Sequence, residues 1–164
     1  MVEFLPTIIL RHRKENLKKC SLRGLEKRED MKFYTYPQQM DFSLDGYVML
    51  YLDENAPELS INDLSKGLFF LDSTWSYEKK MHDQLKKKHQ LIYRSLPKGF
   101  STAYPREQTH CDDPTRGLAT LEAIFIAYTI LKRDTSHLLE NYYFASEFMN
   151  KNQPLLKNLS EQTC

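Results

Sequence analysis

The chain has 164 residues, of which 41% are hydrophobic and 12% aromatic, and its formal net charge is +1. This size is enough for one domain with a substantial buried core. The near-zero net charge by itself argues neither for nor against a nucleic-acid partner.

The three cysteines, Cys20, Cys111 and Cys164, are odd in number and far apart. They exclude a disulfide framework and a zinc-finger pattern, and a reducing, cytoplasmic setting fits them best. The first ten residues lack the basic start and long apolar core of a secretory signal, and no apolar run approaches the length of a membrane span. We therefore expect a cytoplasmic protein without a membrane partner.

The first third of the chain alternates apolar runs with polar segments. Residues 11–30 are polar and basic, and they predict a mixture of loop and helix in which Gly24 is a breaker. Residues 57–63 predict a connection that contains one helical turn. Three apolar or aromatic runs predict strands, over residues 6–10, 33–36 and 47–52.

A buried strand is expected at 67–72. Four apolar residues from Leu68 to Leu71 follow a glycine and end abruptly on Asp72, which is typical of a parallel strand. Ligands in open α/β sheets lie just beyond the carboxyl ends of strands, so Asp72 is a candidate functional residue. From Trp75 to about Gln90 the pattern becomes that of a lysine-rich amphipathic helix. The local sequence leaves open whether Asp72 contacts a ligand, caps this helix, or does both.

The second half begins with a short predicted strand at 91–93. Residues 95–116 show no helical or strand period, and such a long irregular segment is usually functional or disordered. Two helices are expected next, an apolar and therefore buried one over 118–131 and an amphipathic one over 136–150. Residues 151–164 are expected to form a polar tail.

Strands that alternate with helices predict an α/β class with a mainly parallel sheet. We expect a single domain over 1–150, in which residues 1 to about 45 are a candidate small subdomain. The sequence contains no glycine-rich phosphate loop and no Gly-x-Ser-x-Gly elbow, and its five histidines lack metal-ligand spacing. No metal site is therefore predicted.

Basic residues gather in local clusters, among them Arg11-His12-Arg13-Lys14 and Lys86-Lys87-Lys88-His89. A single cluster of this kind is typical of a solvated face. Several clusters that converge on one rim would instead indicate a phosphate-binding surface.

Four short motifs resemble those of one enzyme superfamily. Asp72-Ser73-Thr74-Trp75 resembles the Asp-x-Thr-Trp signature of DTW-domain proteins, and Gly117-Leu118-Ala119-Thr120-Leu121-Glu122-Ala123 resembles their Leu-Ser-Thr-x-Glu-Ala stretch. Lys18-Lys19-Cys20-Ser21 and the Leu59-Ser60 segment, with Asp63 retained, resemble elements of the related ribosomal-RNA aminocarboxypropyltransferases. The motifs occur in the expected order and span roughly residues 7 to 150.

The resemblance implies a SPOUT-like fold whose C-terminal part forms a trefoil knot that holds S-adenosylmethionine. It also implies a metal-free monomer that transfers the 3-amino-3-carboxypropyl group to N3 of a uridine or pseudouridine in tRNA or rRNA. A SPOUT-type RNA methyltransferase and a non-catalytic RNA- or ribosome-binding module are the alternatives. The segment 102–106 departs from the ribosomal branch, and the cysteine-rich start of the DTW branch is absent, so the choice of RNA stays open.

The resemblance assigns roles to particular residues. Asp72 is expected to be a base or to stabilise the sulfonium charge, and Trp75 to wall the cofactor or stack on the target base. Glu122, on an otherwise apolar helix, needs a partner if it is buried and is expected to brace a loop backbone. The expected cofactor contacts are Ser21, Trp75, Leu96, Thr102, Ala103, Leu118, Ala119 and Thr120. The expected RNA contacts are Arg11, Arg13, Lys79, Lys80, Arg94, Arg106 and Arg116.

Overall fold

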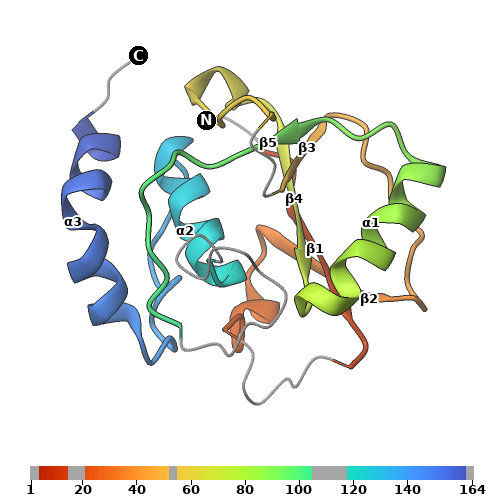
Figure 1. Cartoon of the computed structure of the whole chain (residues 1–164), viewed down its shortest axis with the longest axis horizontal. Helices are drawn as coiled ribbons and strands as arrows, with labels where there is room; N and C mark the ends of the chain where they lie inside the picture. The colour runs from red at the N-terminus through yellow and green to blue at the C-terminus, as the bar shows by residue number, and fades with distance from the viewer. Residues whose placement is uncertain (1–3, 15–20, 52–54, 105–117, 162–164) are drawn as a thin grey trace. The chain divides into compact units, whose positions relative to one another are not determined.

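The computed structural model describes residues 4–14, 21–51, 55–104 and 118–161, with every side chain in these ranges except that of Trp75. The chain divides into two compact units. The sheet unit comprises Met1–Pro57 and Ser65–Ser95, and the helical unit comprises Glu58–Leu64 and Leu96–Cys164. Figure 1 shows α1 against the sheet in the first unit and α2 beside α3 in the second.

Five strands form the sheet, in the order β2-β1-β4-β3-β5. Every pairing among the described strands is parallel, which confirms the predicted α/β class with a parallel sheet. The trefoil knot stays a prediction. The strands are β1 (Thr7–His12), β2 (Met31–Tyr36), β3 (Tyr47–Leu50), β4 (Gly67–Asp72) and β5 (Tyr93–Arg94).

Strands β1 and β4 are central neighbours, and their register places Arg11 opposite Asp72. From β1 the chain continues to β2 on one side of this pair, and from β4 it continues through α1 to β5 on the other side. Ligands in open α/β sheets bind beyond the carboxyl ends of two such strands, where the chain leaves in opposite directions. The ends of β1 and β4 are therefore the place in this sheet where a ligand is expected.

Helix α1 (Trp75–Lys88) packs on one face of the sheet, as the sequence predicted. Met81 and Leu85, one helical turn apart, are fully buried in a core cluster with Ile8 and Leu10 of β1. Because side chains alternate between the two faces of a strand, the odd-numbered residues of β1 point away from α1. This alternation sends Arg11 to the face opposite α1.

The glycine that begins β4 permits a close approach between neighbouring strands. A Cβ atom added at Gly67 would lie 2.5 Å from the ring of Tyr47, which is well inside van der Waals contact. The Tyr47 ring is held in place because its hydroxyl donates a 2.6 Å hydrogen bond to the carbonyl oxygen of Pro6. A side chain at position 67 would therefore displace the start of β3 from β4.

Two 3-10 turns also match the sequence prediction. One, η1 (Leu25–Lys27), follows Gly24, whose φ of 91° ends the preceding turn as expected of a breaker. The other, η2 (Ile61–Asp63), is the predicted helical turn of the connection, and Ser60 and Asp63 cap each other's backbone.

The helical unit is built on α2 (Thr120–Ile130) and α3 (Ala145–Glu161). Helix α2 is apolar nearly all round and buried, as predicted. The side chain of Lys132, just beyond α2, donates to the carbonyl oxygen of Leu159 at 2.9 Å and so satisfies a C-terminal carbonyl of α3. Among the described residues, no helix combines the length and hydropathy of a membrane span.

The prediction for the last helix was wrong. We expected a helix over 136–150 and a polar tail from Lys151, but residues 135–144 form successive turns and α3 continues to Glu161. His137 has a φ of 64°, a left-handed conformation that a continuous helix cannot contain. The supposed tail buries one face of α3 through Asn152, Leu156 and Leu159.

Candidate functional site

The carboxyl ends of β1 and β4 are joined by a buried ion pair. The Nε of Arg11 donates to the Oδ2 of Asp72 at 3.1 Å, and both side chains are less than a tenth exposed. Burial of two charges is tolerable because each neutralises the other and the hydrogen bond replaces lost water. Asp72 is therefore held at the strand end by a specific cation from the neighbouring strand.

A second carboxylate completes this cluster. The Nη1 of Arg11 donates to the Oε1 of Glu26 in η1 at 3.2 Å, and the guanidinium carbon lies 4.8 Å from the ring centre of Phe33. Glu26 in turn accepts from the backbone N–H of Gly24 at 2.9 Å. The guanidinium of Arg11 thus faces two carboxylates at the strand ends.

In the helical unit, a completely buried carboxylate organises an irregular loop. Glu122 is 0% exposed and accepts hydrogen bonds from the hydroxyls of Thr102 and Tyr142, at 2.7 and 3.0 Å. It also accepts from the backbone N–H groups of Ala103 and Ala119, at 2.9 and 2.8 Å. Four donors occupy the acceptor positions of this carboxylate, so its hydrogen-bonding capacity is satisfied in a buried place.

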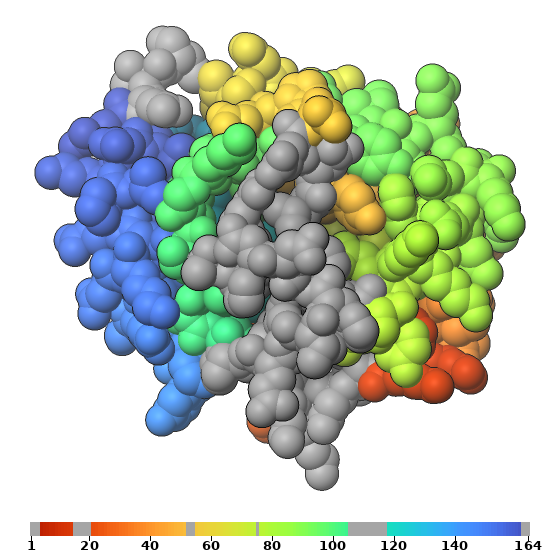
Figure 2. Space-filling model, in the orientation of Figure 1, coloured from red at the N-terminus to blue at the C-terminus, as the bar shows by residue number. Residues whose placement is uncertain are grey.

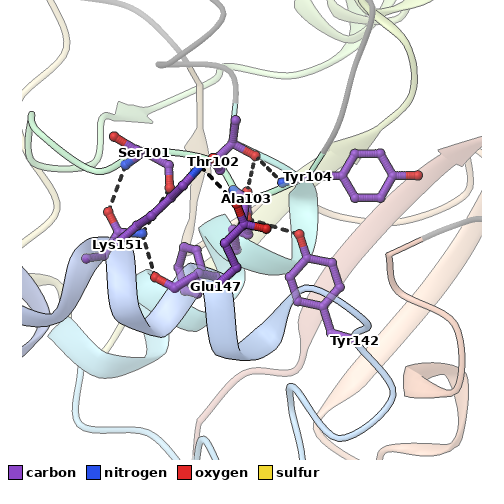
Figure 3. A network of polar contacts seen from close by, with 10 residues as sticks. Ser101, Thr102, Ala103, Tyr104, Tyr142, Glu147 and Lys151 are labelled. Carbon is purple, nitrogen blue, oxygen red and sulfur yellow. Dashed lines mark hydrogen bonds and ion pairs between the residues drawn. The ribbon is translucent and has the colours of Figure 1, made fainter.

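The loop is also fastened to α3, as Figure 3 shows for its backbone and for Lys151. The amide of Asn152, 1% exposed, accepts from the N–H of Ser101 at 2.8 Å and donates to its carbonyl oxygen at 2.9 Å. Lys151 donates to the carbonyl oxygen of Thr102 at 3.3 Å and pairs with Glu147 at 3.4 Å. Contacts from two helices thus fix residues 101–104, which have no regular secondary structure.

A pre-formed irregular backbone of this kind can bind a small polar ligand. Its position is set by side chains before the ligand arrives, so little conformational entropy is lost on binding. Among the residues predicted to contact a cofactor, Glu122 brings together Thr102, Ala103 and Ala119. Thr120 follows directly as the first residue of α2.

The other predicted site residues have different surroundings. Ser21, Leu96 and Leu118 are half-buried, and Asp72 is buried. Trp75 is the first residue of α1, and its side chain lies outside the described part of the structure. Thr74, not Asp72, holds the N-cap position of α1, and its side chain makes no capping bond.

The predicted RNA contacts divide into three groups. Arg13, Lys79 and Lys80 are exposed, and Arg94 is half-buried with its Nη1 bonded to the carbonyl oxygen of Tyr93 at 2.8 Å. Arg11 is a correction: its guanidinium is buried between two carboxylates and is not presented to a phosphate. Arg106 and Arg116 lie outside the described residues, as does most of the Lys18–Ser21 motif.

A half-buried imidazole, that of His82, lies near the carboxyl edge of the sheet unit. His82 is hydrogen-bonded through Nε2 to the hydroxyl of Tyr93 at 2.6 Å and stacks on Tyr51. Burial, followed by the positive charge of Lys86, lowers the pKa of His82, and Asp83 opposes this effect. Uncharged His82 therefore persists to lower pH than a histidine in water.

Several site residues were missed by sequence reasoning. Tyr142 was assigned to the predicted amphipathic helix and Asn152 to the predicted polar tail. No local sequence pattern indicates that a residue contacts a loop 40 or 50 positions away. The role of Glu122 did have a local signal, since a glutamate three residues into a helix commonly accepts from the N-cap N–H. Among the described residues, no group of three histidines, cysteines or carboxylates is arranged to hold a metal ion.

The fold is similar to one solved structure of known activity, the SAM-dependent rRNA:acp-transferase Tsr3 from Vulcanisaeta distributa. The alignment has a TM-score of 0.67 and 22% sequence identity, and it covers 95% of this chain and 83% of that chain. At this identity the comparison establishes a shared fold. No family model and no curated protein matches the chain.

Proposed function

We propose that the protein is an S-adenosylmethionine-dependent aminocarboxypropyltransferase that acts on N3 of a uridine or pseudouridine in RNA. The observation that carries the proposal is the fold shared with an rRNA acp-transferase over 95% of this chain. The Asp72–Trp75 and Glu122 motifs, which resemble that superfamily in sequence, support the same reading independently of the fold.

The reaction joins a nitrogen of the base to a carbon of the sulfonium donor. The N3 lone pair attacks the first carbon of the aminocarboxypropyl arm, and the bond from that carbon to sulfur breaks. Its electron pair returns to sulfur, methylthioadenosine leaves, and the N3 proton passes to water or a nearby base. No metal or oxidant is needed for this balance.

We assign Asp72 a charge-stabilising role in this reaction. Its carboxylate is held at the strand end by Arg11, and a carboxylate in that place attracts a sulfonium or an amino group. Because the Asp72 carboxylate already accepts a hydrogen bond from the Arg11 guanidinium, we assign it this role and not that of the base.

We assign the binding of the donor to the irregular segment organised by Glu122. Backbone groups of Thr102, Ala103 and Ala119 are fixed in advance, and Leu96, Leu118 and Thr120 flank them in the sequence. Ser21 is proposed to contact the amino-acid arm of the donor, and Trp75 is proposed to pack against one side of the sulfonium. The proposed RNA is ribosomal or transfer RNA.

Parallel labelling tests the proposal. Purified protein is incubated with RNA from a strain that lacks its gene, using donor labelled either in the carboxyl carbon or in the methyl group. We expect carboxyl label in the RNA and methylthioadenosine as by-product. Methyl label with S-adenosylhomocysteine would identify a methyltransferase instead. Absence of donor binding in calorimetry, with RNA binding retained, would identify a non-catalytic RNA-binding module.

A further inference from the structure

The end of β1 and the first half of α1 meet in an aromatic contact. His12 stacks on Tyr77, with ring centres 4.0 Å apart and an interplanar angle of 11°. The ammonium of Lys14 lies 5.6 Å from the centre of the Tyr77 ring. In Figure 2 the start of α1 (yellow-green) lies beside the β1 segment (red) on one face of the molecule. These contacts belong to the sheet unit alone and fix the two segments together.

Cations from both segments converge around this contact. Arg13 and Lys14 follow β1, Lys79 and Lys80 lie on α1, and all four side chains are exposed. The positive charges of Arg13, Lys14 and Lys80 all reach the buried ring of His12, where, after burial itself, they lower its pKa. The surface around the His12–Tyr77 contact therefore has a positive potential, to which two separate stretches of the sequence contribute.

Some other basic residues of the described structure form ion pairs with carboxylates. Arg28 pairs with Asp30, Lys86 with Asp83 and Lys151 with Glu147. Within the described residues, no carboxylate forms an ion pair with any of the four cations around the His12–Tyr77 contact. Exposed cations that two segments of the chain bring to the same contact suit a polyanion such as the phosphate backbone of a nucleic acid.

We infer that Arg13, Lys14, Lys79 and Lys80, here called the β1–α1 rim, bind the phosphate backbone of the substrate RNA. The inference deepens the proposed function by naming the surface that holds its RNA. It also excludes two sets of basic residues: buried Arg11, and the Lys86–Lys88 cluster at the far end of α1. Because the β1–α1 rim contacts phosphates and not base edges, it positions the RNA without selecting a nucleotide sequence.

Matched charge removals test the inference. The double variant Arg13→Ala/Lys80→Ala is compared with Lys87→Ala/Lys88→Ala. The second variant removes the same amount of charge from two exposed positions of α1, the helix that also carries Lys80. The probe is a fluorescein-labelled RNA hairpin, titrated at several salt concentrations. We expect the rim variant to lose at least tenfold in affinity, with a salt slope about 1.4 to 1.8 lower, and the control to bind within about twofold of wild type.

Equal losses in the two variants, or no loss in either, would overturn the inference. Equal weakening of binding to vesicles that contain phosphatidylserine would also overturn it, because the rim would then be a general anion surface. Calorimetry with S-adenosylmethionine separates this inference from the proposed function: we expect unchanged donor affinity in both variants. A wild-type protein that binds the hairpin through the rim but binds no donor would refute the function and leave the surface in place.

Discussion

Arg11 and Asp72 lie 61 residues apart in the sequence but occupy paired positions on the two central strands, with Nε and Oδ2 separated by 3.1 Å. The position of the candidate catalytic carboxylate therefore depends on Arg11, a residue that the sequence suggested for RNA contact. A variant of Asp72 must therefore be chosen so that the guanidinium keeps a hydrogen-bond acceptor.

Asp72→Asn keeps an oxygen for Arg11 but removes the negative charge. We expect the fold to survive and the rate of methylthioadenosine release to fall on the order of a hundredfold or more, because charge stabilisation at the sulfonium is lost. Asp72→Ala is a poorer test, since truncating one member of a buried pair costs about 3–5 kcal/mol in stability. Asp41→Asn, at an exposed position of the same unit, is the control. Activity within a few-fold of wild type would reduce Asp72 to a structural role.

Glu122→Gln tests the buried carboxylate. The amide group replaces one oxygen, so at least one of its four donors loses its acceptor and the remaining bonds lose their charge. We expect the free energy of unfolding in urea to fall by about 2–4 kcal/mol. Glu140→Gln, 63% exposed, should change it by less than about 0.5 kcal/mol. Equal effects of the two substitutions would show that the network does not stabilise the protein.

Asn152→Ala tests whether fixing the loop matters for the donor. The substitution removes two hydrogen bonds to the backbone of Ser101, so the loop samples more conformations before binding. We expect the dissociation constant for S-adenosylmethionine to rise about five- to tenfold in calorimetry. Asn158→Ala, exposed on the same helix, should leave it unchanged. An unchanged affinity in Asn152→Ala would remove this loop from the proposed donor site.

Buried His12 and half-buried His82 predict a pH dependence of stability. Burial is the main cause that lowers the pKa of both His12 and His82 below the usual 6.5. The unfolded chain therefore binds these protons at a higher pH than the folded one, and the free energy of unfolding falls as pH drops from about 7.5 through 6.5. Urea titrations at pH 7.5 and 6.0 measure the fall.

His12→Gln/His82→Gln should flatten this dependence. His137→Gln is the control, because that side chain is 77% exposed. A slope that is the same in the double variant and in wild type would show that other groups cause the dependence.

Much of the sheet could be predicted because its strands are short apolar runs with clear ends. The boundaries of β4 and the start of α1 follow directly from the four apolar residues before Asp72 and the change of period after it. Helix α2 was predictable for the same reason, since its residues are apolar nearly all round.

The C-terminal helix was misplaced because local pattern and tertiary packing disagree there. Leu138 and Tyr142 have helical spacing, but the left-handed conformation of His137 and successive turns bury them without a helix. The polar residues from Lys151 onward made this segment look like a tail, whereas Asn152, Leu156 and Leu159 of α3 are buried. Likewise, no local pattern distinguishes buried Arg11 from exposed Arg13, because that difference depends on which partner lies on the neighbouring strand.

The strand order also constrains how the chain folds during synthesis. Strand β1 ends at His12, yet its second neighbour, β4, is complete only when Asp72 has been made. Until then β1 can pair only with β2, and the edge that later meets β4 exposes the backbone of the apolar residues Ile8, Ile9 and Leu10. A nascent chain at this stage presents an unpaired strand edge to other chains and to chaperones. Such long-range parallel pairing also slows folding, because the entropy of closing the loop is lost before the strand contacts form and stabilise the chain.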